Sequence, residues 1–447
     1  MHGKGFLKFL LVIIAISLLM DWYVFNGVKT VTRGWRSRPA RLLVNWGWLA
    51  LSLGITILFF AGIGSFDTPW GMTPYHEWIL SLFVVFLITK LLFILILFIG
   101  DIGRLFYGII KYVAAATRCA AVPQRRPQTP APTRETPSAQ APTLRAPREP
   151  FFPSRRKFIS EAAILVAAIP FSGFLYAMLK GKYNYKIHRQ TLYFDDLPSA
   201  FDGFTITQLS DVHSGSFDNA QAVERGIQLA KTQNSDLFVF TGDLVNNAAW
   251  EIEPYIAAFS QLRAPYGQFS ILGNHDYGDY VKWGSPEKKA ANLAAVKAQH
   301  QTLGYRLLLN EHTEIQKDGQ KIVLLGVENW GRGFIQLGDI DKALEGVDDK
   351  AFKILLSHDP THWEEKIRHH PSTIHLTLSG HTHGAQFGVE TDKLRWSPSQ
   401  YRYLDWAGLA QEKDRYLYVN RGFGFLAFSG RLGIWPEITV ITLKKTV

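Results

Sequence analysis

Cysteine is almost absent from this chain: Cys119 is the single cysteine among 447 residues. One thiol cannot form a disulfide within the chain, so no disulfide framework supports the fold. Sites built from several cysteine thiolates are excluded for the same reason. Stability must therefore come from a hydrophobic core, and residues 185–447 are long enough to bury a large one.

Lysine and arginine are missing from one connecting segment and frequent in its neighbours. The segment Ser65–Glu77 contains neither residue, whereas arginine is frequent after residue 99. Five basic residues also follow the first long apolar run: Lys29, Arg33, Arg36, Arg38 and Arg41. Loops rich in lysine and arginine stay on the cytoplasmic side of a membrane. The net charge of +10 thus indicates membrane topology, and no nucleic-acid-binding patch accompanies it.

Four apolar runs of about 20 residues are each long enough to cross the hydrocarbon core as a helix. They cover about Phe6–Phe25, Leu42–Ile63, Trp78–Ile99 and Phe158–Leu179. With the charge distribution, they predict a multi-pass protein of the inner (cell) membrane. The N-terminus and everything after the fourth run are then extracytoplasmic. We interpret Asp21 and Lys90 as residues near the membrane interface rather than parts of a conduction route.

Proline recurs every few residues between positions 122 and 153, among threonine, alanine, glutamine and arginine. Such a composition predicts a disordered or polyproline linker, although a proline-rich ligand for a partner domain is an alternative. The following stretch SRRKFIS, Ser154–Ser160, resembles a twin-arginine export signal, with an ordinary basic flank as the alternative. No Ala-x-Ala-type cleavage site is evident, so we expect the fourth run to remain as an anchor.

These features predict four regions: a membrane domain of three helices (1–121), the linker (122–153), the signal-like fourth helix (154–184) and an α/β domain (185–447). Within the last region, short runs rich in β-branched residues predict buried strands. They lie at 204–210, 236–242, 268–273, 322–327, 352–357, 374–380, 416–420 and 437–443. The segments 219–233, 250–262 and 290–303 carry apolar residues on one helical face. We expect one or two sheets covered by helices.

Aspartate, histidine or asparagine follows five of these strands. Because ligands collect at the carboxyl ends of strands in open α/β sheets, we expect the five strand ends to share a site. In chain order, they carry Asp211-Val-His213, Gly242-Asp243, Gly273-Asn274-His275-Asp276, His358-Asp359 and Gly380-His381-Thr382-His383.

This set offers carboxylates, imidazoles and one amide oxygen, but no thiol. Such ligands suit Mn, Fe, Zn, Co or Ni. There are more of them than one ion needs, so two divalent ions about 4 Å apart, with one carboxylate bridging, would use them. Each motif alone has an ordinary alternative: a strand-end aspartate as a helix cap, Gly242-Asp243 as a turn, or His358 as a core histidine. Their order and spacing together indicate a metal site.

The five motifs resemble the blocks of the calcineurin-like metallophosphoesterases, over about Thr205–Leu443. The anchor and the signal-like stretch are similar to those of the bacterial membrane-associated branch of that family, although the three preceding apolar runs are a departure. The resemblance implies a two-sheet α/β/β/α sandwich behind N-terminal transmembrane helices. It also implies hydrolysis of a phosphodiester or pyrophosphate bond by a hydroxide that two metals activate.

The resemblance further implies a role for each site residue. His275 would face the phosphate and stabilise or protonate the leaving oxygen, and Asp276 would orient it. The metal ligands would be Asp211, His213 and His383 for the first ion, Asn274, His358 and His381 for the second, and Asp243 as the bridge.

The sequence constrains the substrate class less than it constrains the reaction. The candidates are a phosphodiester, a lipid-linked phosphate and the pyrophosphate of a nucleotide-sugar lipid, and an anchored site near a bilayer favours an amphipathic substrate. Several aromatic residues lie near the motifs, either as a membrane-facing rim or as ordinary packing: Tyr277, Tyr280, Trp283, Trp330 and Trp363. A catalytically silent, metal-binding membrane sensor or scaffold is the second functional hypothesis, but every ligand position is present, which favours an enzyme. No protein partner is indicated.

Overall fold

The computed structural model describes residues 3–62, 73–120, 155–391 and 393–446. These residues form two compact units. One comprises Met1–Gly54 with Phe86–Phe171, and the other comprises Ile55–Val85 with Ser172–Val447. The predicted linker lies outside the described residues, so its disorder stays a prediction.

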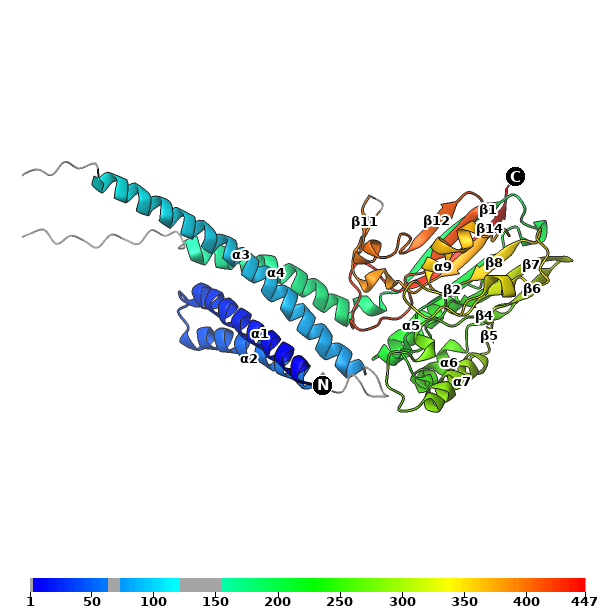
Figure 1. Cartoon of the computed structure of the whole chain (residues 1–447), viewed down its shortest axis with the longest axis horizontal. Helices are drawn as coiled ribbons and strands as arrows, with labels where there is room; N and C mark the ends of the chain where they lie inside the picture. The colour runs from blue at the N-terminus through cyan, green and yellow to red at the C-terminus, as the bar shows by residue number, and fades with distance from the viewer. Residues whose placement is uncertain (1–2, 63–72, 121–154, 392, 447) are drawn as a thin grey trace, which may run out of the picture. The chain divides into compact units, whose positions relative to one another are not determined.

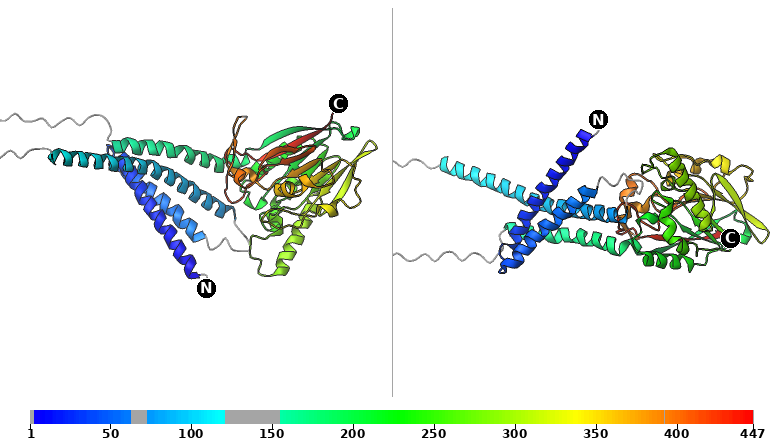
Figure 2. Two further views of the ribbon diagram at one scale, coloured as in Figure 1. Left: turned by 45° about the horizontal axis from the view of Figure 1, so that its top comes forward. Right: turned by 90° about the horizontal axis from the view of Figure 1, so that it is seen from below.

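Four helices are long and apolar enough to span a membrane, as the sequence predicts. They are α1 (Gly3–Thr32), α2 (Arg38–Gly62), α3 (Pro74–Ala120) and α4 (Arg155–Leu179). Helix α3 has 47 residues and extends well past the predicted run on its C-terminal side. Helices α1 and α2 form a hairpin (Figure 2), in which the Thr32 hydroxyl donates a hydrogen bond of 2.9 Å to Asn45 Oδ1.

A buried ion pair lies inside the first unit. Lys90 Nζ is 2.8 Å from Asp21 Oδ1, and the two side chains are only 3% and 2% exposed. The Ser52 hydroxyl donates to the same carboxylate oxygen at 2.7 Å. Both side chains are thus buried within the first unit, and their expected place near the membrane interface stays a prediction. They neutralise each other because an unpaired charge in such surroundings costs several kcal/mol.

The second unit contains two six-stranded sheets that face each other (Figure 1). The first sheet has the order β1 (Lys186–Phe194), β14 (Glu437–Lys445), β2 (Thr205–Leu209), β3 (Leu237–Phe240), β4 (Gln268–Ser270), β5 (Arg306–Leu307). The second has the order β12 (Gly408–Glu412), β13 (Arg415–Val419), β9 (Leu376–Ser379), β8 (Lys353–Leu356), β7 (Gln320–Gly326), β6 (Glu311–Lys317). All eight predicted strands are present. The sequence did not predict β1, β5, β6 and β12, nor the small ribbon of β10 (Val389–Glu390) and β11 (Arg395–Trp396).

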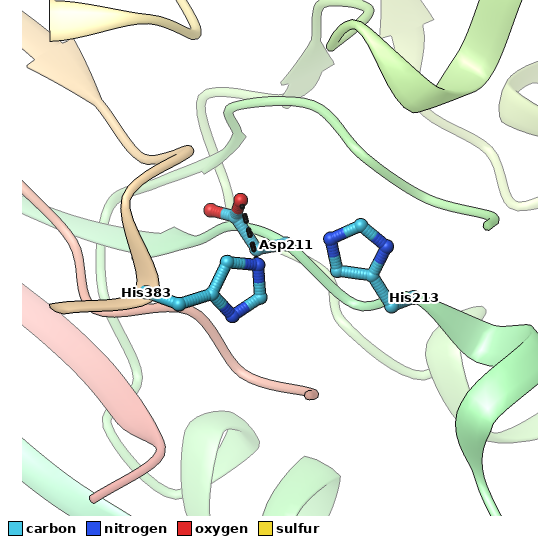
Figure 3. Close-up of side chains that lie close together, drawn as sticks. All are labelled: Asp211, His213 and His383. Atoms are coloured by element: carbon cyan, nitrogen blue, oxygen red, sulfur yellow. Dashed lines mark ion pairs between the residues drawn. The ribbon is translucent and has the colours of Figure 1, made fainter. Parts of the chain in front are cut away.

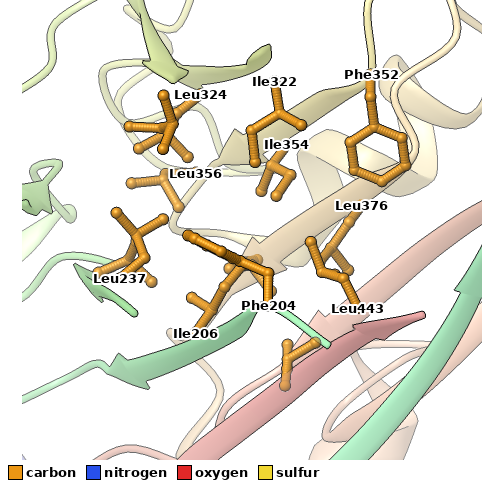
Figure 4. Packing of buried hydrophobic residues seen from close by; sticks show 14 of the residues in the cluster. Phe204, Ile206, Leu237, Ile322, Leu324, Phe352, Ile354, Leu356, Leu376 and Leu443 are labelled. Carbon is orange, nitrogen blue, oxygen red and sulfur yellow. The ribbon is translucent and has the colours of Figure 1, made fainter. Parts of the chain in front are cut away.

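Successive side chains along a strand point to opposite faces of the sheet. One face packs in the core between the two sheets, and the other packs against helices. In β3, Leu237 and Val239 join the core between the sheets, which Figure 4 shows, whereas Phe238 and Phe240 point to the helices on the other face. That outer face is covered by α5 (Ala220–Lys231) and α7 (Pro286–Thr302). The second sheet is covered by the short helices α8 (Ile340–Ala343) and α9 (Pro360–Glu365). The predicted α/β/β/α sandwich is confirmed.

The segment 250–262, which we expected to form one α-helix, has a different secondary structure. A 3-10 helix covers Ala249–Tyr255, and only the short α6 (Ile256–Phe259) is α-helical. Pro254 lies inside this segment. Proline lacks the amide hydrogen that an α-helix needs and clashes with the preceding turn, which explains why the apolar periodicity was misleading here.

The register of the strands brings the predicted site together. Strands β2, β3 and β4 pair in parallel, and so do β7, β8 and β9. Parallel strands end at the same edge of a sheet, so the loops after β2, β3, β4, β8 and β9 emerge together.

The core next to this edge contains a buried carboxylate, Glu437 at the start of β14. Arg421 Nη1 lies 2.5 Å from its Oε2, and the Tyr418 and Thr439 hydroxyls each donate to its Oε1 at 2.6 Å. Burial alone raises the pKa of Glu437, but Arg421 and these hydrogen bonds outweigh burial and lower the pKa from 4.5 to about 2.

We therefore expect acid to destabilise the second unit through Glu437. A carboxyl group with a lowered pKa in the folded state stabilises the fold above pH 4.5, and this contribution is lost as the pH falls toward 2. The loss amounts to on the order of 1 kcal/mol for each pH unit in that window. Thermal unfolding of the detergent-solubilised chain should show Glu437→Gln to be less stable than wild type at pH ~7, with a difference that shrinks toward pH ~3. A difference that does not change with pH would contradict this account.

Candidate metal centre

The predicted ligands lie on loops with an unusual backbone conformation. Five of them have a positive φ: Asp211 (52°), His213 (47°), Asp243 (58°), His381 (72°) and His383 (50°). Non-glycine residues in this region cost about 1–3 kcal/mol each and persist where the surrounding structure holds them. Aspartate and histidine tolerate the conformation better than most residues. The loops thus turn sharply at the strand ends and direct these side chains inward.

One cluster of ligand atoms comprises Asp211, His213 and His383, as Figure 3 shows. Asp211 and His213 come from the loop after β2, and His383 comes from the loop after β9. Their candidate ligand atoms lie within 4.8 Å of one another, with His383 Nε2 3.3 Å from Asp211 Oδ1. Both ring nitrogens of His213 are buried without a hydrogen-bond partner among the described residues. Buried polar atoms are rarely left unpaired, so this cluster fits a cation.

A second cluster comprises Asp243, His358 and His381, again with ligand atoms within 4.8 Å of one another. His358 Nε2 is 3.2 Å from Asp243 Oδ2 and 3.3 Å from His381 Nδ1. The same Asp243 Oδ2 lies 3.5 Å from His213 Nε2 in the first cluster. The Asp243 carboxylate therefore lies between the two clusters, and its bridging role stays a prediction.

The amide of Asn274 is oriented by a tyrosine. Asn274 Nδ2 donates a hydrogen bond of 2.7 Å to the hydroxyl of Tyr280. This bond fixes the opposite atom, Oδ1, which is buried and has no hydrogen-bond partner in the part of the chain that the structure describes. An amide oxygen held in this way is a suitable ligand for a hard cation.

Charge coupling changes the acidity of the site. Burial alone would raise the pKa values of Asp211 and Asp243, but neighbouring histidines outweigh it and lower both. Burial would also lower the pKa of His358, yet Asp243 and Asp211 raise it to about 10. Burial lowers the pKa values of His213 and His381. Both carboxylates are therefore ionised at neutral pH, which favours cation binding.

His275 lies beside the clusters with a defined tautomer. Its Nδ1 is 2.8 Å from the main-chain oxygen of Asn246 and donates to it, since a carbonyl can only accept. Its backbone N–H donates to Asp243 Oδ1 at 2.8 Å, and its ring lies 4.4 Å from that of Tyr280. Nε2 is thus the nitrogen that can exchange a proton with a substrate. Burial lowers the pKa of His275.

Asp276 does not orient His275, so that implied role is wrong. Its carboxylate accepts hydrogen bonds from the backbone N–H groups of Asp243 (2.9 Å), Gly273 (2.8 Å), Leu244 (2.9 Å) and Val245 (3.3 Å). Asp276 therefore holds the loop that carries Asp243, and the Asn246 carbonyl orients His275 instead.

Three residues behind the ligands were not predicted to have a role. Tyr403 Oη is 2.9 Å from His381 Nε2, and Asp359 Oδ2 is 3.3 Å from the same nitrogen, which leaves His381 Nδ1 for an ion. The buried Arg431 has Nη2 2.9 Å from His383 Nδ1. Asp359 follows His358 directly and had a sequence signal. Tyr403 and Arg431 lie outside every motif and had none.

The aromatic residues near the motifs divide between packing and the site. Tyr277, Trp330 and Trp363 are 3%, 5% and 2% exposed and belong to the core, which confirms the packing alternative for them. Trp283 donates its Nε1–H to the Gly278 carbonyl at 2.6 Å. Tyr280 contacts both Asn274 and His275, so it is a residue of the site itself.

Comparisons with known proteins identify two matching families. Residues 204–385 match the family described as calcineurin-like phosphoesterase, and residues 7–182 match the one described as probable calcineurin-like phosphoesterase, transmembrane domain. The uncharacterized metallophosphoesterase YkuE of Bacillus subtilis is 30% identical over 301 residues, which cover 66% of this chain and 98% of that protein.

The chain belongs to the calcineurin-like phosphoesterase family.

Two further relatives resemble the phosphoesterase. An uncharacterized metallophosphoesterase of Aquifex aeolicus is 29% identical over 278 residues, covering 60% of this chain and 97% of that protein. A transmembrane protein with metallophosphoesterase domain from Bos taurus is 29% identical over 262 residues, covering 56% of this chain and 54% of that protein. The family uses divalent metals, and the two clusters of this phosphoesterase can hold them.

We expect the full-length phosphoesterase, purified in detergent and loaded with Mn²⁺, to hold roughly two ions per chain. Asp243→Asn weakens a ligand to both clusters, so bound metal should fall to less than about half of that content. Elemental analysis measures the result. His312→Ala is the matched control, because His312 belongs to neither cluster. Equal metal content in Asp243→Asn and the control would contradict the bridging position.

Proposed function

We propose that the chain is a membrane-anchored hydrolase of phosphodiester or pyrophosphate bonds that works with two divalent ions, drawn from Mn, Fe, Zn, Co and Ni. The observation that carries this proposal is the position of Asp243, with one oxygen 3.2 Å from His358 and 3.5 Å from His213. A single carboxylate shared between two ligand clusters suits a pair of neighbouring ions.

The seven ligand residues supply the charge and geometry for this chemistry. Asp211, His213 and His383 form one set; Asn274, His358 and His381 form the other, with Asp243 between them. Two divalent ions held there would lower the pKa of a water molecule and offset the charge of the phosphoryl oxygens. The loops, in which several ligand residues have a left-handed backbone conformation, hold the ligands in place before the substrate binds. Little reorganisation is therefore needed during the reaction.

His275 is suited to the leaving oxygen. The Asn246 carbonyl accepts from Nδ1–H, so Nε2 faces the departing group and donates to it when the ring carries its second proton, which the nearby Asp243 carboxylate favours. The ring packs at 4.4 Å against Tyr280 and at 4.9 Å against His213. These contacts restrict ring rotation and keep Nε2 beside the ligand clusters.

Membrane topology supports an extracytoplasmic domain. Helix α4 leads directly into it, and the start of α3 hydrogen-bonds to it through Glu77 and Ser81. The start of α3 and the end of α4 then lie on one side of the membrane. The loop before α3 lacks lysine and arginine, whereas five basic residues lie between the middles of α1 and α2. By the positive-inside rule, the α3 start and the domain are outside.

The substrate-facing side of the second cluster carries an exposed cation, Arg402. Its guanidinium lies 5.0 Å from the ring centre of Phe334 and 5.3 Å from that of Tyr403. Both rings contact His381, at 4.7 Å and 5.5 Å between ring centres. Arg402 is thus one aromatic ring away from a metal ligand, and a guanidinium there suits an anionic phosphate group. This supports an anionic substrate, for which a lipid-linked phosphate is one candidate because the domain is anchored beside a bilayer.

The full-length protein in detergent should hydrolyse bis-nitrophenyl phosphate with Mn²⁺ or another of the five metals. Asp243→Asn should lower kcat/KM by about a hundredfold or more, because both ions lose a ligand. His312→Ala should retain wild-type activity. A wild-type protein that binds metal but turns over neither this diester nor pyrophosphate esters would favour the sensor or scaffold hypothesis.

Removing the charge of Arg402 tests its role toward the substrate. We expect Arg402→Gln to raise KM about tenfold for a phosphodiester, with kcat changed less, because a charge-assisted hydrogen bond to the phosphate is worth roughly 1.5 kcal/mol. The KM of Arg402→Lys should lie between those of the wild type and Arg402→Gln. Steady-state kinetics provides the measurement, and Arg306→Gln, an exposed arginine paired with Glu311, is the matched control. An unchanged KM in Arg402→Gln would exclude this contact.

A further inference from the structure

The first turn of α3 contributes a buried carboxylate to the phosphoesterase domain. Glu77 is 0% exposed and belongs to the same compact unit as the two sheets. Its Oε1 accepts a hydrogen bond of 2.6 Å from the Ser216 hydroxyl and one of 3.4 Å from the backbone N–H of Ala427. A residue from the membrane-spanning part of the chain thus lies in the interior of the domain that carries the metal ligands.

This hydrogen bond continues to the candidate proton donor. Ser216 Oγ, which donates to Glu77, accepts a hydrogen bond of 3.0 Å from Asn246 Nδ2. The main-chain oxygen of Asn246 in turn accepts from His275 Nδ1 at 2.8 Å. Three hydrogen bonds therefore connect Glu77 with the ring of His275. Ser216 and Asn246 are 1% and 3% exposed, so water does not compete for these groups.

The middle bond of this chain joins two ligand loops. Ser216 follows His213 by three positions, and its backbone N–H donates to the His213 carbonyl at 2.9 Å. Asn246 follows Asp243 by three positions in the loop after β3. The Ser216–Asn246 bond thus adds a side-chain link between the loops of the two clusters, which backbone hydrogen bonds from His213 N–H to the Asp243 carbonyl and from Ser214 N–H to the Leu244 carbonyl, each of 3.1 Å, also join. Glu77 orients the serine hydroxyl that makes this connection.

A second set of contacts holds the same helix turn without reaching His275. Trp78 Nε1 donates to Asp218 Oδ2 at 2.6 Å, and Lys182 Nζ lies 2.5 Å from the same oxygen. The Ser429 backbone N–H donates to the Ser81 hydroxyl at 2.7 Å. These contacts attach α3 to the domain, but none of them involves Ser216 or Asn246. Substitutions at these contacts therefore serve as controls that weaken the attachment of α3 without breaking the hydrogen bonds that lead to His275.

We propose that Glu77 is a positioning residue for His275, which makes the first turn of α3 a working part of the phosphoesterase site. This inference rests on the proposed hydrolase function. It gives the third membrane helix a role beyond anchoring: the helix supplies the acceptor that orients Ser216, Ser216 orients the Asn246 side chain, and the Asn246 carbonyl sets the position of the His275 ring.

Loss of this acceptor shifts the loop rather than unfolding it. The backbone N–H groups of Asn246, Asn247 and Ala248 also donate to the buried carboxylate of Glu251. The loop after β3 therefore keeps its anchor when Glu77 is removed. The Asn246 carbonyl is then free to move by a fraction of an ångström, and small displacements of a proton donor slow the reaction without weakening substrate binding.

The test uses the full-length protein in detergent with Mn²⁺ and bis-nitrophenyl phosphate. We expect Glu77→Ala to lower kcat about tenfold, with KM and bound metal unchanged within about twofold. Ser216→Ala should give the same loss. The double variant should be no slower than either single variant, because both substitutions break one chain of hydrogen bonds.

Two further variants separate positioning from attachment. In Glu77→Gln, the amide oxygen still accepts from Ser216, so kcat should stay within about twofold of wild type. Trp78→Phe removes the bond to Asp218 but leaves the chain to His275, so its kcat should also remain near wild type. If Glu77→Ala fails to fold, the kcat of Ser216→Ala is compared with the kcat of Trp78→Phe and of the double variant that combines them. This comparison also separates positioning from attachment.

The outcomes distinguish this inference from the function on which it rests. Absence of turnover in the wild type overturns both. With an active wild type, three results overturn the positioning role alone: wild-type kcat in Glu77→Ala and Ser216→Ala, losses that multiply in the double variant, or an equal loss in Trp78→Phe. A loss confined to Glu77→Ala, Ser216→Ala and their combination supports it.

Discussion

The structure depends on one electrostatic constraint at the carboxyl edge of the two sheets. Asp211 and Asp243 are 0% and 1% exposed, and four imidazoles surround them. Charges buried in this way are stable only when opposite charges or metal ions offset their desolvation. In the described structure, His358 partly does so, with its pKa raised to about 10 by the two carboxylates. Divalent ions would replace that proton and complete the compensation, which explains why a fold tolerates so many polar groups beside its core.

The residues around the ligands serve the same constraint. Asp276 accepts four backbone hydrogen bonds and holds the Asp243 loop, while Tyr403 and Asp359 hold His381. The left-handed backbone at Asp243 and His381 is strained, and these surrounding contacts help to maintain it. Glu77 extends this support into the membrane-spanning part of the chain. Hydrogen bonds within one compact unit thus connect the first turn of α3 with the loops that carry the candidate ligands.

Much of the fold was predictable because it follows from local periodicity. Runs of β-branched residues identified all eight core strands, since buried parallel strands are apolar on both faces. The strands that were missed are at or near sheet edges: β6 reads EHTEIQK, with mostly exposed or half-exposed residues and little hydrophobic signal. The helix expected at 250–262 failed at Pro254, where a backbone effect outweighs the apolar pattern. The pairing of Asp21 with Lys90 also escaped prediction, because residues 69 positions apart share no local pattern.

The sequence by itself determined the four apolar helices and the eight predicted strands and indicated the candidate ligands, because each depends on consecutive residues. Only the tertiary structure decided the distances within and between the two clusters that the family resemblance implies, and that Asn246 rather than Asp276 orients His275. It also decided that Tyr403, Arg431 and Glu77 belong to the supporting contacts. These contacts depend on which loops meet at the edge of the sheets. The distances between loops are set by long-range packing and not by local sequence.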